Sequence, residues 1–177
     1  MFLQKVIKNK EKIVIVDFGS QVTKLIARRI RDLKVYCEVV NLQDFKKIKN
    51  FEKIKGIILS GGPSTVVGKK FPKISNNLFY KNIPVLGICY GLQLIAKIFG
   101  GKIKKENKKR EFGKVILFEK AKSKLTKNFF IKKRSIVWMS HQDVVTKIPK
   151  YFKIIASTNS SKFTIIQQKK KNIFGIQ

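Results

Sequence analysis

Three short apolar runs, each followed at once by a glycine-containing turn, occupy the first half of the sequence at residues 13–16, 56–59 and 84–88. Uninterrupted apolar runs of this length are typical of strands that are buried on both faces of a sheet. Apolar residues at helical spacing fill residues 22–33 and 92–99, which follow the first and the third run. Strands that alternate with helices predict an α/β fold with an open, mostly parallel sheet flanked by helices.

The second half of the chain has a different pattern, in which short apolar segments alternate with turns and Lys-rich loops. These segments predict extra short strands, besides one at residues 36–40 in the first half, at residues 115–118, 136–139, 152–156, 163–167 and 173–177. No repeat or linker divides the sequence, so we expect a basic N-terminal tail over residues 1–12 and one domain over residues 13–177. Because the chain ends inside an apolar run, we expect this domain to be incomplete at its C-terminus.

The charge of the chain is strongly basic, with 40 Lys and Arg against 10 Asp and Glu and a formal net charge of +30. Such a charge favours a polyanionic partner, either a nucleic acid or an acidic membrane. However, only five of the 40 are Arg, the residue that base readout and bidentate phosphate contacts favour. The Lys are spread along the chain, and Lys, Ile and Asn, which have A/T-rich codons, are all abundant. We therefore interpret the charge as compositional bias and expect no specific nucleic-acid partner.

Two cysteines, Cys37 and Cys89, are too few for a disulfide framework. The first residues lack the apolar core of a secretory signal. The longest uncharged apolar stretch, residues 83–96, is shorter than the roughly 20 residues that a membrane span needs. We therefore expect a cytoplasmic protein with no membrane partner. Cys37 lies in an apolar strand with no glycine or base beside it, so we expect it in the core.

The third apolar run leads into Gly87-Ile88-Cys89-Tyr90-Gly91, between a predicted strand and a predicted helix. This is the G-x-nucleophile-x-G elbow, with Cys as the nucleophile. The two glycines let strand and helix approach closely, and the helix N-terminus favours the thiolate, so we expect a lowered pKa for Cys89. The backbone N–H of Tyr90 is placed to face a developing oxyanion. The alternative is an ordinary buried cysteine, but the register of both glycines favours the nucleophile.

Two further segments are candidates for the same site. Ser60-Gly61-Gly62-Pro63 follows another parallel strand, and its Gly-rich turn is either a substrate-binding backbone, a plain tight turn or a phosphate cradle. The only histidine, His141, lies two residues before Asp143. It is either the base for Cys89, with Asp143 as its orienter, or a residue that lines the pocket or has a structural role, and the residues alone leave these alternatives open. No cluster of His, Cys, Asp and Glu has metal-ligand spacing, so we expect no metal.

Taken together, six stretches resemble the class I (triad-type) glutamine amidotransferases, and among them the glutaminase domain of GMP synthases. The stretches follow the family order and cover nearly the whole chain from Ile13. They are Asp17-Phe18-Gly19-Ser20-Gln21, Leu59-Ser60-Gly61-Gly62-Pro63-Ser64, Gly87-Ile88-Cys89-Tyr90-Gly91-Leu92-Gln93, Arg110-Glu111-Phe112-Gly113, Val137-Trp138-Met139-Ser140-His141 and Phe174-Gly175-Ile176-Gln177. The cysteine elbow and the Gly-Gly-Pro loop belong to the whole class, whereas the first, fourth and fifth stretches point to GMP synthases. The resemblance implies the flavodoxin-like class I glutaminase fold.

The resemblance also implies a reaction. Cys89 attacks the side-chain amide of glutamine, and the resulting thioester releases ammonia before it is hydrolysed. The N–H groups of Gly62 and Tyr90 form the oxyanion hole, and the positions that hold the amino-acid end of glutamine are Gln93, Ser140 and His141. The ammonia serves the conversion of XMP to GMP in purine nucleotide biosynthesis, on an ATP-pyrophosphatase (synthetase) domain in the same or a separate chain. ATP and Mg belong to that synthetase domain, and none is expected as a cofactor here.

Two departures from the family pattern affect these implications. In the family the base is a His with an orienting Glu, directly after the last strand, so the resemblance implies that both lie beyond Gln177 and that this chain is inactive alone. Gln142 stands where the family has Gly, which strains the turn by roughly 1 kcal/mol if φ is positive there. The alternatives are a catalytically dead glutaminase-like fragment, a glutaminase subunit of the anthranilate or carbamoyl-phosphate synthase type, and a basic nucleic-acid-binding protein.

Overall fold

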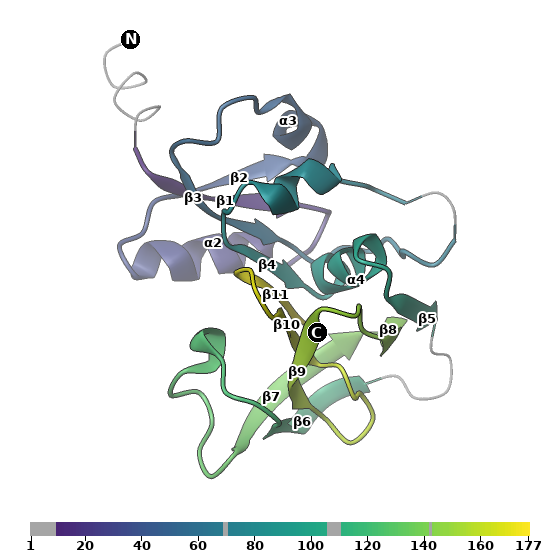
Figure 1. Cartoon of the computed structure of the whole chain (residues 1–177). Helices are drawn as coiled ribbons and strands as arrows, with labels where there is room; N and C mark the ends of the chain where they lie inside the picture. Colours follow the sequence, from purple (N-terminus) through teal and green to yellow (C-terminus); the bar gives the residue numbers. More distant parts are fainter. Residues whose placement is uncertain (1–9, 69–70, 106–110, 142) are drawn as a thin grey trace.

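The structure, a computed structural model, describes residues 10–68, 71–105, 111–141 and 143–177 (Figure 1). Within these residues, nine strands form one mixed sheet in the order β2-β1-β3-β4-β11-β10-β9-β6-β7. The first five in this order run parallel, and they are β2 (Cys37–Asn41), β1 (Lys12–Asp17), β3 (Ile54–Leu59), β4 (Val85–Ile88) and β11 (Ile173–Ile176). This is the strand order of flavodoxin-like sheets, so the predicted α/β fold is confirmed.

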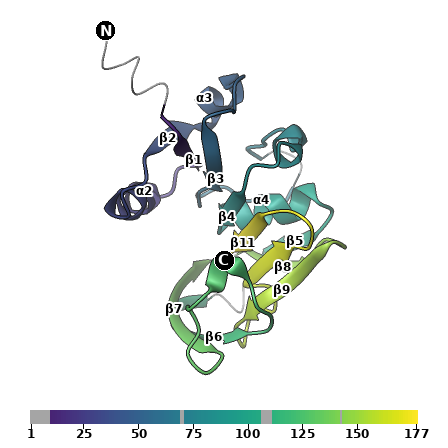
Figure 2. The same ribbon diagram turned by 60° about the vertical axis from the view of Figure 1, so that its left-hand side comes forward.

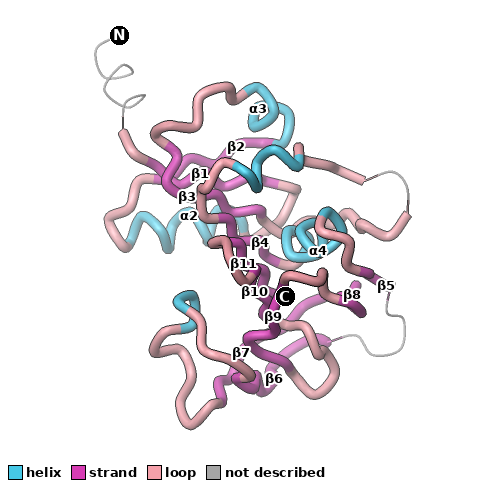
Figure 3. The backbone as a smooth tube through the Cα atoms, in the orientation of Figure 1, coloured by secondary structure: helices cyan, strands magenta, loops and turns pink. Residues whose placement is uncertain are grey.

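The other four strands are antiparallel and extend the sheet beyond β11 (Figures 1 and 3). They are β10 (Ile165–Gln168), β9 (Phe152–Ser157), β6 (Glu111–Glu119) and β7 (Arg134–His141), so the extra short strands of the second half are also confirmed. A separate two-stranded sheet joins β5 (Lys102–Lys105) to β8 (Asp143–Lys147). Neither of these two strands is predicted from the sequence, since Lys residues occupy three of the four positions of β5.

Helices pack against both faces of the parallel strands (Figures 2 and 3). One face is covered by α2 (Thr23–Asp32), which buries Ala27 against Ile15 and Cys37. On the opposite face lie α4 (Tyr90–Ile98), α3 (Leu42–Lys47) and the 3₁₀ turn η1 (Asn76–Tyr80), where the main core gathers around Leu59 and Leu92. A second 3₁₀ turn, η2 (Lys124–Thr126), lies between β6 and β7. Cys37 is 1% exposed, as expected of a core residue.

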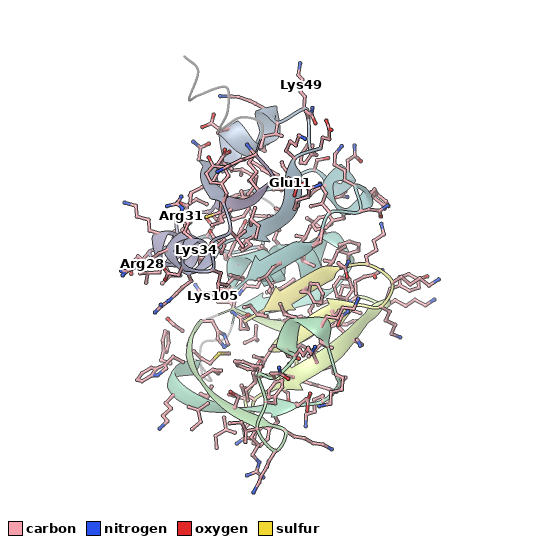
Figure 4. All side chains as sticks on the ribbon, turned by 90° about the vertical axis from the view of Figure 1, so that its left-hand side faces the viewer. Glu11, Arg28, Arg31, Lys34, Lys49 and Lys105 are labelled. Atoms are coloured by element: carbon pink, nitrogen blue, oxygen red, sulfur yellow. The ribbon has the colours of Figure 1, made fainter. Side chains whose placement is uncertain are left out.

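The apolar stripe predicted on the first helix is only partly correct. Ile26 and Ile30 pack on the sheet beside Ala27, but Leu25 and Leu33 are exposed. The helix packs over β1 and β2, of which β2 is the edge strand of the sheet, and its leucines lie outside this contact. Figure 4 shows Arg28 and Lys34 projecting from this part of the molecule.

The turn that leads into α2 is organised by Asp17 rather than by Ser20. Asp17 Oδ1 accepts hydrogen bonds from the N–H groups of Gly19 and Ser20 and from the hydroxyl of Thr23. Ser20 Oγ accepts the N–H of Val22, which precedes the first residue of the helix, Thr23. A carboxylate accepts several hydrogen bonds at once, which a single hydroxyl does less well.

The boundary predicted for the N-terminal tail falls close to the start of the sheet. β1 begins at Lys12, one residue before the predicted domain start, and residues 1–9 lie outside the described part of the chain. Among the described residues, no helix is long and apolar enough to cross a membrane.

Candidate functional site

Cys89 occupies the turn between β4 and α4, with a positive φ of 49° and ψ of −104°. A residue other than glycine adopts such a backbone only when the surrounding structure fixes it. The N–H of Cys89 donates to Ile176 O at 2.8 Å, and its carbonyl accepts the N–H of Gln93 at 3.1 Å. The turn is therefore tied both to β11 and to the first turn of α4, and it holds the thiol at the carboxyl edge of the sheet.

The glycines on either side of Cys89 are required by sterics, as the elbow motif predicts. A Cβ on Gly87 would lie 2.4 Å from the backbone of Gly91, and a Cβ on Gly91 would lie 2.2 Å from Leu59 O. Real Cβ contacts are essentially never shorter than 3.0 Å. Strand β4, helix α4 and strand β3 thus approach more closely at this point than any side chain allows.

The loop after β3 lies against the same turn. An added Cβ on Gly61 would lie 3.6 Å from Cys89 Cβ, and one on Gly62 would lie 2.4 Å from Phe18 O. Ser60 is fully buried, and its hydroxyl accepts the N–H of Phe18 at 3.0 Å. The Gly-Gly-Pro segment thus packs between the ends of β1 and β4, next to the thiol of Cys89.

A cavity of about 450 Å³ opens at Cys89. It brings together all six of the residues that sequence reasoning assigned to a site, namely Gly62, Cys89, Tyr90, Gln93, Ser140 and His141. The remaining residues of its wall are Pro63, Ser64, Thr65, Lys105, Phe112 and Asp143. Four separate segments contribute to this wall: the loop after β3, the elbow with the start of α4, the end of β5, and the β6–β7 hairpin with the start of β8.

A matching family model decides which class of protein this arrangement belongs to. The model for "Glutamine amidotransferase class-I" matches residues 14–177, nearly the whole chain. The chain belongs to the class I glutamine amidotransferases.

Curated relatives of this amidotransferase are GMP synthases named as glutamine-hydrolysing. The protein of Brachyspira hyodysenteriae is 46% identical over 172 residues, which cover 96% of this chain and 32% of the relative. The protein of Finegoldia magna is 46% identical over 168 residues, again covering 32% of the relative. The amidotransferase chain therefore spans about a third of the length of these relatives.

Solved structures agree with this assignment. A Thermoplasma acidophilum protein, described as one of the subunits of a GMP synthase, superposes with a TM-score of 0.78 at 28% identity, over 96% of this chain and 83% of that one. A glutamine amidotransferase of Thermotoga maritima superposes with a TM-score of 0.70 at 16% identity, over 96% of this chain and 75% of that one. The second likeness shows the fold alone.

The side chain of Tyr90 packs in the core of the amidotransferase, and its hydroxyl bonds to the protein backbone instead of serving the cavity. The side chain is 2% exposed, its hydroxyl donates to Pro72 O at 2.8 Å, and its ring lies 5.0 Å from that of Phe18. Burial raises the pKa of Tyr90 to about 12, so the phenol stays protonated. What Tyr90 offers a substrate is therefore its backbone at the first position of α4.

Gln93 links the helix to the segment after β7. Its side chain is 4% exposed, and Nε2 donates to the backbone oxygen of Asp143 at 3.2 Å. Asp143 is buried in turn, and its carboxylate accepts the hydroxyl of Thr65 from the loop after β3. Sequence reasoning considered Asp143 only as an orienter of His141 and missed Thr65. The burial of the Asp143 carboxylate could not be predicted, because β8, the strand that contains it, was not predicted either.

His141 and Ser140 end β7, and they differ in exposure. His141 is buried, whereas Ser140 is exposed, as expected of neighbours on a strand that point to opposite faces. Lys105, at the end of β5, brings a positive charge to the cavity wall, near the border between the parallel strands and the hairpin (Figure 4). Lys105 lies in a Lys-rich segment for which the sequence predicts neither a strand nor a site residue. Gln142 and Arg110, singled out in the sequence, lie outside the described residues.

Burial raises the pKa of the Cys89 thiol above its ordinary value, so the expectation of a lowered pKa was wrong for this structure. The cause of the shift is desolvation, because burial penalises the charged thiolate. The thiol is therefore protonated at neutral pH. A general base must remove the proton of the Cys89 thiol before the sulfur becomes a strong nucleophile.

A larger cavity, of about 670 Å³, lies elsewhere and is lined by seven Lys, among them Lys122, Lys153 and Lys171. It contains one carboxylate, Glu119, and neither of the two cysteines. Its wall carries no residue of the nucleophilic elbow, so the smaller cavity at Cys89 is the candidate active site.

Proposed function

We propose that this domain hydrolyses glutamine with Cys89 as the nucleophile. The observation that carries the proposal is the single cavity at Cys89, which joins all six expected residues from distant parts of the chain. In this reaction Cys89 Sγ attacks the amide carbon, and the N–H groups of Gly62 and Tyr90 stabilise the oxyanion. Collapse of the tetrahedral intermediate breaks the C–N bond and releases ammonia. Water then hydrolyses the thioester, giving glutamate and the free thiol.

The walls of the cavity suit the two charged groups of glutamine. Asp143 is a buried carboxylate that fits the α-ammonium group, and Lys105 supplies a positive charge for the α-carboxylate. Gln93, Ser140 and His141 complete the part of the wall that holds the amino-acid end. In this proposal His141 contacts the substrate, which agrees with its place at the end of β7.

The base for Cys89 is, we propose, a group other than His141. The resemblance to the family implies that the base is a His with an orienting Glu that follow the last strand, whereas His141 ends β7 and lines the cavity as a substrate contact. His141 is the only histidine of the 177 residues. We therefore expect these 177 residues alone to release ammonia from glutamine slowly.

The acceptor of the ammonia is XMP in this proposal, and the product is GMP. The support is the name that the relatives carry, glutamine-hydrolysing GMP synthase, at 46% identity over nearly the whole of this chain. A synthetase part, in the same or a separate chain, would bind ATP and Mg, and the glutaminase domain needs no cofactor of its own.

Covalent labelling tests the glutaminase proposal directly. The purified chain is incubated with a glutamine analogue that carries an electrophilic ketone in place of the amide, and the modified residue is located by mass spectrometry. We expect one adduct, on Cys89, that is suppressed by excess glutamine and persists in Cys37→Ser. Cys37, 1% exposed, is the matched control because it is the other cysteine of the chain. Labelling that glutamine does not suppress contradicts a glutamine pocket and favours the catalytically dead module.

An ammonia-release assay tests the assignment of the base. We expect the chain to release ammonia from glutamine far more slowly than the full-length Brachyspira hyodysenteriae relative under the same conditions. Turnover at a comparable rate, lost in His141→Asn but not in a surface variant such as Lys34→Ala, would show that His141 is the base after all.

A further inference from the structure

One face of the β6–β7 hairpin is apolar and exposed. Side chains alternate between the two faces of a strand, and here the inward face buries Leu117 and Met139. The outward face carries four large apolar side chains, with exposed fractions of 56% for Phe112, 47% for Ile116, 60% for Ile136 and 80% for Trp138. Single exposed apolar residues are ordinary, but four on one face of one hairpin are not.

The register of the hairpin makes these residues one surface. Opposite one another across the two strands lie Phe112 and Ser140, Lys114 and Trp138, Ile116 and Ile136, and Phe118 and Arg134. We call these eight residues the hairpin face. Trp and Arg are enriched at the energetic centres of protein interfaces, and Phe is enriched in interfaces generally. β7 is also the last strand of the sheet, so no further described strand pairs with its outer edge.

The hairpin face is continuous with the cavity at Cys89. Phe112 and Ser140, which form the pair at one end of the face, both line that cavity. A protein that covers the hairpin face therefore also reaches the mouth of the cavity. Ammonia that leaves Cys89 would then be released toward that protein rather than into bulk water.

We propose that the hairpin face is the docking surface for the synthetase part of a GMP synthase, with Trp138 as its central contact. The proposal rests on the proposed function, since the relatives at 46% identity are GMP synthases of which this chain spans 32%. The remainder of such a protein needs a contact surface on this domain next to the site that makes ammonia.

The charge of the hairpin face indicates the chemistry of the partner surface. Lys114 and Arg134 are the ionisable residues among its eight members, and both are basic. The guanidinium of Arg134 lies 5.6 Å from the ring centre of Phe118, a cation–π arrangement that keeps it on this face. The fitting partner surface has an apolar centre that receives Trp138, with carboxylates at its rim opposite the two basic residues.

Trp138 is the only Trp of the chain, so incorporating fluorotryptophan gives a single ¹⁹F NMR signal from the hairpin face. The partner is the part of the Brachyspira hyodysenteriae GMP synthase outside the matched 32%, produced separately and used only if it shows a cooperative thermal transition. We expect its addition to shift or broaden the ¹⁹F signal.

Calorimetric titration of the same partner then measures the affinity of variants. We expect Trp138→Ala to raise Kd about 30-fold, with Ile136→Ala and Arg134→Glu weakening binding in the same direction. Leu33→Ala removes an equally exposed apolar side chain, 77% exposed, from the end of α2 and is expected to leave Kd unchanged. Because Trp138 is 80% exposed, its replacement leaves the core intact, which the thermal transition of each variant checks.

The outcomes separate this proposal from the proposed function. Binding that Trp138→Ala leaves unchanged, or no binding to a folded partner, overturns the docking surface. A ¹⁹F signal that shifts with the concentration of the chain alone overturns it in favour of self-association through β7. Cys89 labelling by the glutamine analogue is measured on the same samples, so a loss of the glutaminase proposal is recognised independently of docking.

Discussion

Replacing Gly91 by Ala places a methyl group 2.2 Å from Leu59 O, between α4 and strand β3. Contacts of a Cβ below 3.0 Å are essentially never seen, so at least 0.8 Å, the difference between 3.0 and 2.2 Å, must be found by moving α4 or β3. Both elements are in the main core, and Leu59 and Leu92 are fully buried, so neither moves freely.

The magnitude follows from this overlap. Overpacking a tight core costs about 1–3 kcal/mol. For a domain of this size each kcal/mol lowers Tm by roughly 2–4 °C, so a loss of about 2 kcal/mol lowers Tm by about 4–8 °C. A shift of α4 also moves the backbone N–H of Tyr90 relative to Cys89. Misplacement of about 1 Å costs on the order of 100-fold in rate, so we expect labelling of Cys89 by the glutamine analogue to slow by about that factor.

Gly100→Ala is the matched control for this prediction. Gly100 has a φ of 87°, but an added Cβ meets no atom within 4 Å. Its replacement strains the backbone by about 1–2 kcal/mol without moving α4 against β3, so Tm falls while the labelling rate of Cys89 is retained. The reasoning is refuted if Gly91→Ala melts and labels like the wild type, or if both variants lose labelling equally.

Three further results are expected. Tyr90→Phe removes the hydrogen bond to Pro72 O, lowers the free energy of unfolding by about 1 kcal/mol in denaturant titration, and leaves the labelling rate unchanged, since only the backbone of Tyr90 serves the site. In a variant without the second cysteine, the rate of alkylation of Cys89 by iodoacetamide is followed against pH, and its apparent pKa is expected above the ordinary thiol value. Unfolding in denaturant should restore the ordinary thiol pKa. Because the folded state holds the proton more tightly, the Cys89 thiol stabilises the fold below the pKa of the unfolded state, and this contribution is lost as pH rises through the pKa of the folded state. Gln93→Leu breaks the link from Nε2 to Asp143 O, so protection of the thiol by glutamine needs a higher glutamine concentration, while a protection curve like the wild type's would contradict a role for Gln93.

The predictions from sequence that succeeded rest on local patterns. Each apolar run followed by a glycine turn became a parallel strand, because a strand buried on both faces leaves no polar position in the run. The elbow is predictable for a similar reason. Backbone crowding at Gly87 and Gly91 excludes every side chain, so glycine is required two residues before and two residues after Cys89.

The predictions that failed depend on neighbours that are distant in the sequence. Lys102, Lys104 and Lys105 form β5 only because β8 pairs with them, and no pattern within β5 indicates a strand. The pKa of Cys89 was expected to fall because the helix N-terminus is local and visible in the sequence. Burial by the surrounding loops, which depends on the fold, acts in the opposite direction.

The site also depends on a bend of the sheet that no sequence pattern shows. In the strand order, β7 stands five positions from β4, which in a flat sheet would place the two strands about 24 Å apart. Yet His141 at the end of β7 and Cys89 after β4 line one cavity.

Two features account for the bend. β6 pairs with β9 only at Phe118 and Glu119, so most of the hairpin leaves the sheet. β8 is the next strand after β7 in the chain and pairs with β5, the next element after α4, so the small second sheet draws the hairpin back toward the helix that begins at the elbow. The antiparallel half of the domain thus positions the substrate-binding wall opposite the nucleophile, and weakening the β5–β8 pairing should open the cavity at Cys89 without disturbing the parallel sheet.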